Sequence, residues 1–158
     1  KEIKNDEDWH KFRKSISYVS QKSTLLHGSI KENILFGRKF NKTKYEKIKK
    51  LACIDFVENG ERDDEFLIID NGKNLSGGQA QRISIARSLY SDPELLILDE
   101  ATNQLNEEIE KKIILNIQNE SNGKIFIVTH NKKIKSYIEN YNEFEIENFS
   151  ITNINGKI

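Results

Sequence analysis

The spacing of hydrophobic and polar positions predicts strands in several parts of the chain. Residues 16–20 alternate apolar and polar side chains, which indicates a strand. Residues 95–98 and 125–128 are short uninterrupted apolar runs, as in parallel strands that are buried on both faces. The tail, residues 143–154, alternates again and predicts a small antiparallel hairpin at an edge.

A hydrophobic period of 3.6 residues predicts helices between these strands. Residues 44–59, residues 76–90 and the stretch capped by Asn106 each place a row of apolar side chains on one face. The inward-facing residues are Ile48, Leu51, Ala52 and Phe56 in the first helix, Ile83, Ala86, Leu89 and Tyr90 in the second, and Ile109, Ile113 and Ile117 in the third. Residues 22–37 predict a glycine-punctuated loop, and residues 63–73 are polar and irregular apart from a short apolar run at residues 66–69.

Strand, helix and strand follow one another over residues 95–128, which predicts a right-handed βαβ unit in a parallel sheet. Asp99 and Glu100 end the first of these strands, and His130 follows the second. Because open α/β sheets bind ligands at the carboxyl edge of their strands, these three residues are expected together at such an edge. Two adjacent carboxylates at a strand end point in different directions, so one can hold a metal ion while the other handles a proton.

Ser76, Gly77, Gly78 and Gln79 open the second predicted helix. The pattern Ser-x-x-Gln is a capping box, which by itself indicates only a helix start. Each glycine in the first turn costs up to ~1 kcal/mol relative to alanine. Bare backbone at this place lets a phosphate approach the helix N-terminus closely. A phosphate-binding helix start combined with metal-binding carboxylates indicates nucleotide hydrolysis.

Composition argues against several other classes of protein. The chain has 25 Lys and Arg against 25 Asp and Glu, and this balance gives no reason to expect a nucleic-acid partner. No apolar run approaches the ~18 residues that a membrane span needs. Cys53 is the only cysteine, which implies no disulfide within the chain and fits a reducing cytosol. The chain contains no Met, even at its start, so we expect it to be a piece of a longer protein.

Four motifs, in this order along the chain, resemble those of ABC-type ATPases. Residues 18–21 resemble the Q-loop of that family, and residues 75–79 together with residues 81–87 resemble its signature motif. Residues 95–100 are similar to its Walker B strand, and residues 128–130 to its switch-histidine strand. The four motifs are distributed over residues 16–130, so the resemblance extends over most of the chain and is a strong one.

This resemblance implies an α/β fold, namely part of a P-loop NTPase-like core with a parallel sheet, formed by residues 1–22 and 93–158. A helical subdomain, residues 23–92, is inserted into that core and includes the signature motif. Residues 26–34 further resemble exporters, whose ATPase is fused to a membrane-spanning domain. The implied function is an ATP-binding and ATP-hydrolysing domain that couples hydrolysis to transmembrane transport of a substrate. It would act at the cytoplasmic face of the cell membrane. Its partners would be the transmembrane domain of the same transporter and a second ATPase domain in a head-to-tail dimer.

The resemblance also implies a role for each motif residue, with ATP and Mg²⁺ as the bound groups. Asp99 would bind Mg²⁺, and Gln21 would sense both the metal and the γ-phosphate. Glu100 would be the general base for the attacking water, and His130 would contact the γ-phosphate. The signature residues that would close on the ATP of the partner domain are Ser76, Gly77, Gly78 and Gln79.

Three features depart from the family pattern. The phosphate-binding motif G-x-x-x-x-G-K-[ST] is absent from these residues, so we expect it upstream of Lys1 and expect this fragment alone to be inactive. Asn106 replaces the acidic residue of the loop after Walker B, usually Ser-Ala-Leu-Asp. It is either a neutral helix cap or a change that weakens communication between the two ATP sites. Residues 69–72 keep only the charge and the final glycine of the exporter loop Gly-Glu-x-Gly.

Two other functions remain open at this point. A soluble ABC-type ATPase acting in DNA repair or translation shares the signature and Walker B motifs. The exporter-like residues 26–34 and the absence of a basic surface argue against it. The other function is a non-enzymatic interaction module derived from an ABC ATPase. The intact Glu100 and His130 argue against that possibility.

The predicted loop after Gln21 is unusually apolar for a solvated segment. Either all of its apolar side chains pack inside the domain, or some form an exposed patch near Gln21 that faces away from the nucleotide edge. In the exporters that this chain resembles, a groove beside the Q-loop receives a short helix of the membrane domain, so we expect a patch. Burial of the whole set would contradict this expectation. The set is Leu25, Leu26, Ile30, Ile34 and Phe36.

Overall fold

The computed structural model describes residues 5–58, 62–120, 123–147 and 150–153. Its central sheet has three parallel strands in the order β1-β4-β5, which confirms the predicted βαβ unit and the α/β fold class. The bounds are β1 Ile16–Val19, β4 Leu95–Asp99 and β5 Lys124–Val128. Ile97 of the central strand is the register partner of both Tyr18 and Phe126.

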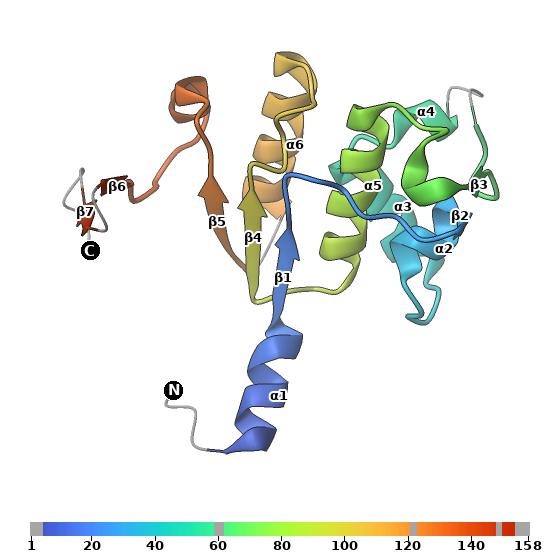
Figure 1. Ribbon diagram of the computed structural model, residues 1–158, viewed down its shortest axis with the longest axis horizontal. Helices are drawn as coiled ribbons and strands as arrows, with labels where there is room; N and C mark the ends of the chain where they lie inside the picture. Colours follow the sequence, from blue (N-terminus) through green and yellow to red (C-terminus); the bar gives the residue numbers. More distant parts are fainter. Residues whose placement is uncertain (1–4, 59–61, 121–122, 148–149, 154–158) are drawn as a thin grey trace.

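The remaining elements follow the chain order shown in Figure 1. The helices are α1 Asp6–Ser15, α2 Ile30–Leu35, α3 Lys42–Leu51, α4 Asp55–Glu58, α5 Gly77–Tyr90 and α6 Glu107–Glu120, with short 3-10 turns η1 Asp70–Gly72 and η2 Lys132–Ser136. Two small antiparallel pairs complete the fold, β2 Gly28–Ser29 with β3 Leu67–Ile68 and β6 Phe144–Glu147 with β7 Ser150–Asn153. The pair β6-β7 confirms the predicted hairpin. Residues 148, 149 and 154 of that prediction lie outside the described residues.

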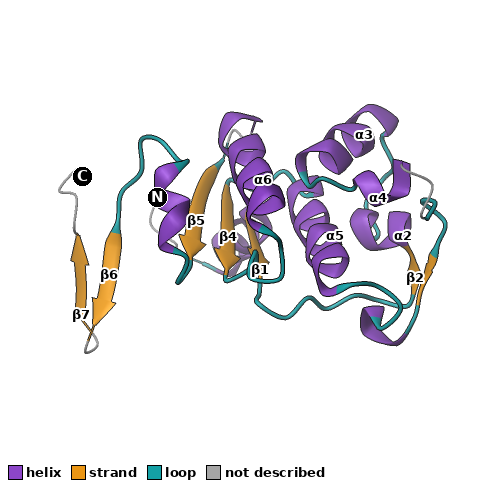
Figure 2. Ribbon diagram, turned by 90° about the horizontal axis from the view of Figure 1, so that it is seen from above, coloured by secondary structure: helices purple, strands orange, loops and turns teal. Residues whose placement is uncertain are grey.

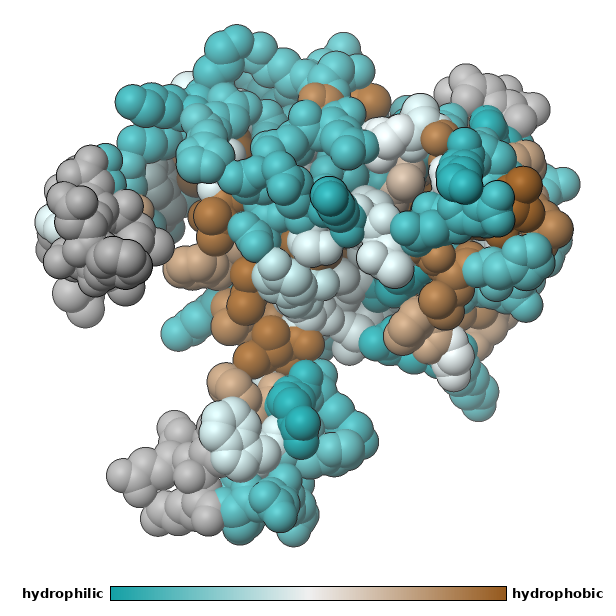
Figure 3. Space-filling model, in the orientation of Figure 1, coloured by the Kyte–Doolittle hydropathy of each residue, from teal (hydrophilic) through white to brown (hydrophobic). Residues whose placement is uncertain are grey.

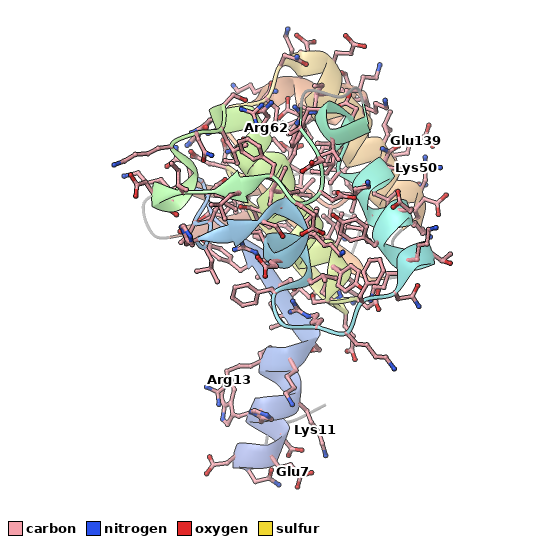
Figure 4. All side chains as sticks on the ribbon, turned by 90° about the vertical axis from the view of Figure 1, so that its right-hand side faces the viewer. Glu7, Lys11, Arg13, Lys50, Arg62 and Glu139 are labelled. Atoms are coloured by element: carbon pink, nitrogen blue, oxygen red, sulfur yellow. The ribbon has the colours of Figure 1, made fainter. Side chains whose placement is uncertain are left out.

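The elements are arranged side by side along the long axis of the molecule. Helices α2, α3 and α4 gather beyond α5, on the side of the sheet where β1 lies, and the β6-β7 pair lies beyond β5 (Figures 1 and 2). Helix α1 extends away from the amino end of β1 and carries the surface charges Glu7, Lys11 and Arg13 (Figure 4). None of the helices that the structure describes combines the length and the apolar character that a membrane crossing requires.

The sheet is covered on one face only by the described residues. Leu96 and Leu98 are buried in one core with Ile113 and Ile117 of α6. The opposite face carries exposed aromatic and aliphatic side chains, among them Phe126 at 48% exposure. Hydrophobic residues gather over the strands in this view (Figure 3). The prediction that residues 125–128 form a strand buried on both faces is therefore wrong, because α6 covers one face and no described element covers the other.

Helix α5 is the most deeply buried element. All four residues of its predicted apolar stripe are buried, and so are the polar residues Gln79, Gln81, Arg82 and Ser84. The helix packs against α2, α3 and β1 at the same time. It is therefore enclosed from several sides, which a single apolar stripe did not predict.

The predicted loop over residues 22–37 contains helix α2. Ser29 accepts a hydrogen bond from the backbone of Glu32 at 3.0 Å, and the Glu32 carboxylate accepts one from the backbone of Ser29 at 2.7 Å. This capping box starts the helix, and Phe36 ends it with a left-handed backbone at φ 47°. The glycine-punctuated appearance of this segment hid a valid Ser-x-x-Glu start signal.

The single helix predicted over residues 44–59 is divided in the structure, and residue 59 lies outside the described residues. It begins at Lys42, where the Asn41 side chain caps the backbone N–H of Lys44 at 3.0 Å. Helix α3 ends at Leu51, and Cys53 then takes a left-handed backbone with φ 53°, which a continuous helix does not permit. The four predicted inward-facing residues are nevertheless all buried.

Ile83, which is fully buried in α5, tests the contribution of this packing to stability. We expect Ile83→Ala to lower the free energy of unfolding by about 2–5 kcal/mol, since it removes buried methyl groups and leaves a cavity. Urea denaturation followed by circular dichroism measures this loss. The matched control is Ile69→Ala at a site with 40% exposure, with an expected loss below about 1 kcal/mol. Equal losses at the two sites would contradict the central position of α5.

Candidate functional site

Glu100 is the centre of a hydrogen-bonded cluster at the carboxyl edge of the sheet. Its Oε2 accepts hydrogen bonds from Gln21 Nε2 at 2.8 Å and from Asn103 Nδ2 at 2.9 Å. Its Oε1 lies 2.8 Å from His130 Nε2. The structure thus brings together Gln21, Glu100 and His130, which are far apart in the sequence.

Parallel strand pairing explains this meeting of residues. Gln21 comes two residues after the end of β1, Glu100 directly after β4, and His130 two residues after β5. The three strands end at the same edge because they run in one direction. The Glu100 side chain is 19% exposed and the His130 side chain 90% exposed, so the cluster has one partly enclosed carboxylate and one freely accessible imidazole.

Glu100 leaves the direction of β4 through an unusual backbone conformation. Its φ is 49°, in the left-handed region that residues other than glycine rarely adopt, and its N–H donates to the carbonyl of Val128 at 2.9 Å. Strained conformations of this kind often occur at functional sites. Here the turn directs the Glu100 carboxylate toward Gln21 and His130.

Asp99 points to a different partner from Glu100. Its Oδ2 accepts a hydrogen bond from the Tyr18 hydroxyl at 2.6 Å, on the open face of the sheet. The expectation that the two adjacent carboxylates point in different directions agrees with this geometry. The hydrogen bond to Asp99 raises the pKa of Tyr18, and partial desolvation and the negative charge of Asp99 act in the same direction.

The signature residues form the start of α5. Ser76 Oγ accepts from the N–H of Gln79 at 3.2 Å, and Gln79 Oε1 accepts from the N–H of Ser76 at 3.0 Å, which confirms the predicted capping box. A Cβ atom on Gly77 would lie 1.8 Å from the Gln104 side-chain oxygen, and one on Gly78 would lie 3.1 Å from the Gln104 backbone oxygen. Gly78 therefore also has a packing reason, which the sequence pattern did not reveal, whereas the flexible end of the Gln104 side chain can move away from Gly77.

The residues at the sheet edge fit only part of a magnesium site. No group of three or more His, Cys, Asp or Glu side chains suited to a metal lies within the described ranges. Mg²⁺ usually takes one or two carboxylates and completes its shell with water and substrate phosphates. The carboxylate of Asp99 and the amide oxygen of Gln21 are ligands of the right chemical kind for such a shared site.

A second surface feature is the groove beside α2. Of the five apolar residues in this segment, Leu25, Ile30 and Ile34 are buried, whereas Leu26 and Phe36 are 52% and 49% exposed. The expectation that part of the set is exposed is confirmed. The groove has a volume of about 380 Å³ and is lined by Leu26, His27, Glu32, Asn33, Phe36 and Gly37.

Arg87 of α5 forms hydrogen bonds with the segment around the groove. Its guanidinium donates to the carbonyl and side-chain oxygens of Asn33 at 2.8 and 2.6 Å and to the carbonyl of Thr24 at 2.8 Å. It also lies 4.9 Å from the centre of the Phe36 ring. Burial lowers the pKa of Arg87, and these three hydrogen bonds stabilise its charged form.

Comparison with known proteins agrees with this geometry. The family model for "ABC transporter" matches residues 1–103. A Rickettsia bellii protein named as an export ATP-binding/permease protein is 39% identical over 119 residues, which cover 75% of this chain and 21% of that protein. The lactococcin-G-processing and transport ATP-binding protein LagD of Lactococcus lactis subsp. lactis is 36% identical over 129 residues, which cover 79% of this chain and 18% of that protein.

A solved structure shares the fold. It is that of a bacterial Atm1-family ABC exporter with ATP bound, which matches with a TM-score of 0.73 and 29% sequence identity. The match covers 77% of this chain and 22% of that chain.

The chain therefore belongs to the ABC transporter family. The names of its relatives confirm the predicted exporter-type ATP-binding domain, and they do not favour a DNA-repair or translation ATPase or a non-enzymatic module. The chain spans about a fifth of the length of these relatives.

Tyr18 is a contact of the site that sequence reasoning missed, and it provides a probe of Asp99. We expect its phenol to titrate above the ordinary pKa of about 10, because deprotonation gives up the hydrogen bond and places a second negative charge beside Asp99. Asp99→Asn should move this titration to lower pH. Nuclear magnetic resonance of chain labelled with ¹³C in the tyrosine rings measures it, with Tyr18→Phe identifying the signal and Glu108→Gln as the control. An unchanged titration in Asp99→Asn would contradict the contact.

Proposed function

We propose that this chain is the ATP-hydrolysing part of an exporter in which ATP hydrolysis drives transport of a substrate across a membrane. The observation that carries the proposal is the Glu100 carboxylate, held between Gln21 and His130 at the carboxyl edge of a parallel sheet. A carboxylate with fixed orientation and partial access to solvent can accept a proton from an attacking water. Membership of the ABC transporter family implies that this water attacks ATP.

The residues of the edge divide the chemistry between them. Glu100 acts as the general base, and His130, whose imidazole is exposed, contacts the γ-phosphate. Asp99 and Gln21 would hold Mg²⁺, which when bound neutralises phosphate charge in the transition state. Gln21 also donates to Glu100, so one side chain connects the phosphate and metal side of the site with the base.

The signature residues at the start of α5 serve a second ATP molecule in this proposal. Ser76 and Gly77 are exposed at the N-terminus of a 14-residue helix, where backbone N–H groups and the helix dipole favour a phosphate. We therefore propose a head-to-tail dimer in which residues 76–79 close on the ATP of the partner domain. No nucleic acid takes part.

The arrangement of the elements supports the following proposed division of the chain. Residues 1–22 and 93–158 contribute the sheet and form part of the catalytic core, and residues 23–92 form a helical subdomain with the signature motif. The phosphate-binding loop, which these 158 residues lack, belongs to another part of the protein, so the fragment alone does not hydrolyse ATP. In this proposal the α2 groove receives a segment of the transmembrane domain, and the chain acts at the cytoplasmic membrane face.

Glu100→Gln in the full-length protein tests the general base. The amide keeps the size of the side chain but cannot accept the proton, so we expect turnover to fall roughly 10²–10⁴-fold while ATP binding stays nearly intact. Phosphate release and nucleotide-binding assays measure the two quantities. Glu108→Gln, an exposed site on the first turn of α6, is the matched control and should keep normal turnover. Unchanged turnover in Glu100→Gln would move the base elsewhere, and His130→Ala would be the next variant to measure.

The α2 groove can be tested by cysteine labelling, because Cys53 is buried in the natural chain. Leu26→Cys should react with a maleimide in the isolated chain and be protected in the full-length protein, where the transmembrane domain covers the groove. Leu67→Cys is the matched control, since Leu67 is 51% exposed and Leu26 is 52% exposed. It should react in both proteins. Equal labelling of Leu26→Cys in both would exclude the groove as the docking surface.

A further inference from the structure

Gln81 of α5 is a buried polar residue that the proposed chemistry does not use directly. It is fully buried, at 0% exposure. Its Nε2 donates to the backbone carbonyl of Gln21 at 3.3 Å, and its Oε1 accepts from the backbone N–H of Gln104 at 3.1 Å. A carboxamide is suited to this place because it offers one donor group and one acceptor, and both are used.

The two segments that Gln81 holds both carry donors to Glu100. Gln21 itself donates to Glu100 Oε2 at 2.8 Å. Asn103, which precedes Gln104, donates to the same oxygen at 2.9 Å. The backbone positions of both donors therefore depend on the same buried amide.

Gln81 also connects these segments with the signature residues. It lies in the same helix, four residues after Gly77, and Gln104 packs closely on Gly77 and Gly78. The end of β1, the loop after β4 and the start of α5 thus meet at one side chain.

We propose that Gln81 is a positioning residue for hydrolysis, which orients Glu100 through Gln21 and the loop that contains Asn103 and Gln104. This inference rests on the proposed function of Glu100 as the base. A shift of about 1 Å in the groups around a reacting centre can reduce the rate 10²-fold. We expect loss of Gln81 to lower turnover more than it changes ATP binding, because Gln81 itself is not one of the proposed nucleotide or metal ligands.

The test is a double-mutant cycle in the full-length protein with Gln81→Leu and Glu100→Gln, measured by steady-state ATP hydrolysis. In the natural background Gln81→Leu should lower kcat about 10- to 100-fold and change KM for ATP less than about twofold. In the Glu100→Gln background it should have little further effect on residual turnover, because a residue acting through Glu100 has nothing left to orient.

Ser84→Ala is the matched control. Ser84 is buried in the same helix, and its hydroxyl has no hydrogen-bond partner among the described residues. Its kcat should match that of the natural protein. If Gln81→Leu unfolds below the assay temperature, Gln81→Glu carries the same cycle. It has the same size and keeps the acceptor for Gln104, but its ionised form has no donor for the Gln21 carbonyl.

The inference and the proposed function fail in different ways. A Gln81 variant with kcat within about twofold of the natural value, or with equal losses in both backgrounds, overturns the positioning role alone. Normal turnover in Glu100→Gln, or no hydrolysis by the natural protein, overturns the proposed function and this inference with it.

Discussion

The parallel register of β1, β4 and β5 determines where every chemical group of the site can lie. Because side chains alternate between the faces of a strand, a slip of β4 by one residue would move Asp99 from Tyr18 to the face covered by α6. Gln21, Glu100 and His130 meet only because all three strands end at one edge. Because Glu100 has a left-handed backbone, its side chain points in a different direction from that of Asp99. The two neighbouring carboxylates therefore bind different partners.

Polar side chains of helix α5 connect the sheet with the other elements of the chain. Leaving a buried charge without a partner costs about 3–5 kcal/mol, so the arginines of this enclosed helix need partners. Arg82 donates to the Cys53 carbonyl and the Asp55 carboxylate, both at 2.6 Å, and Arg87 holds the segment under the α2 groove. The same groups that satisfy the helix thus fix loops that are distant in the sequence. The groove, the signature residues and the sheet edge consequently share one rigid support.

The features that could be predicted from the sequence are those that depend on local rules. Each predicted helical face is buried or half-buried, because the 3.6-residue period depends only on neighbouring residues. The meeting of Glu100 and His130 followed from the general geometry of βαβ units. Helix α1, whose Asn5 cap is a local signal, lies outside the predicted elements, and the cap of α2 lies in a segment whose glycines indicate a loop. The contacts of Gln81 could not be predicted, since they join positions 60 and 23 residues apart that no spacing rule connects.

The open face of the sheet shows which part of the site these residues supply. Tyr18, Phe126 and Val128 are 55%, 48% and 38% exposed on it, and Asp99 lies at its carboxyl end. Removing apolar surface of this kind from water is favourable by roughly 25 cal/mol per Å² of buried area. A segment that covers it would also lower the local dielectric constant around Asp99 and strengthen its attraction to a cation. Under the proposed function, the described residues hold the groups that handle the proton, and a segment packed on this face would supply ligands to the phosphates. Covering this face and completing the ATP site would therefore be the same event.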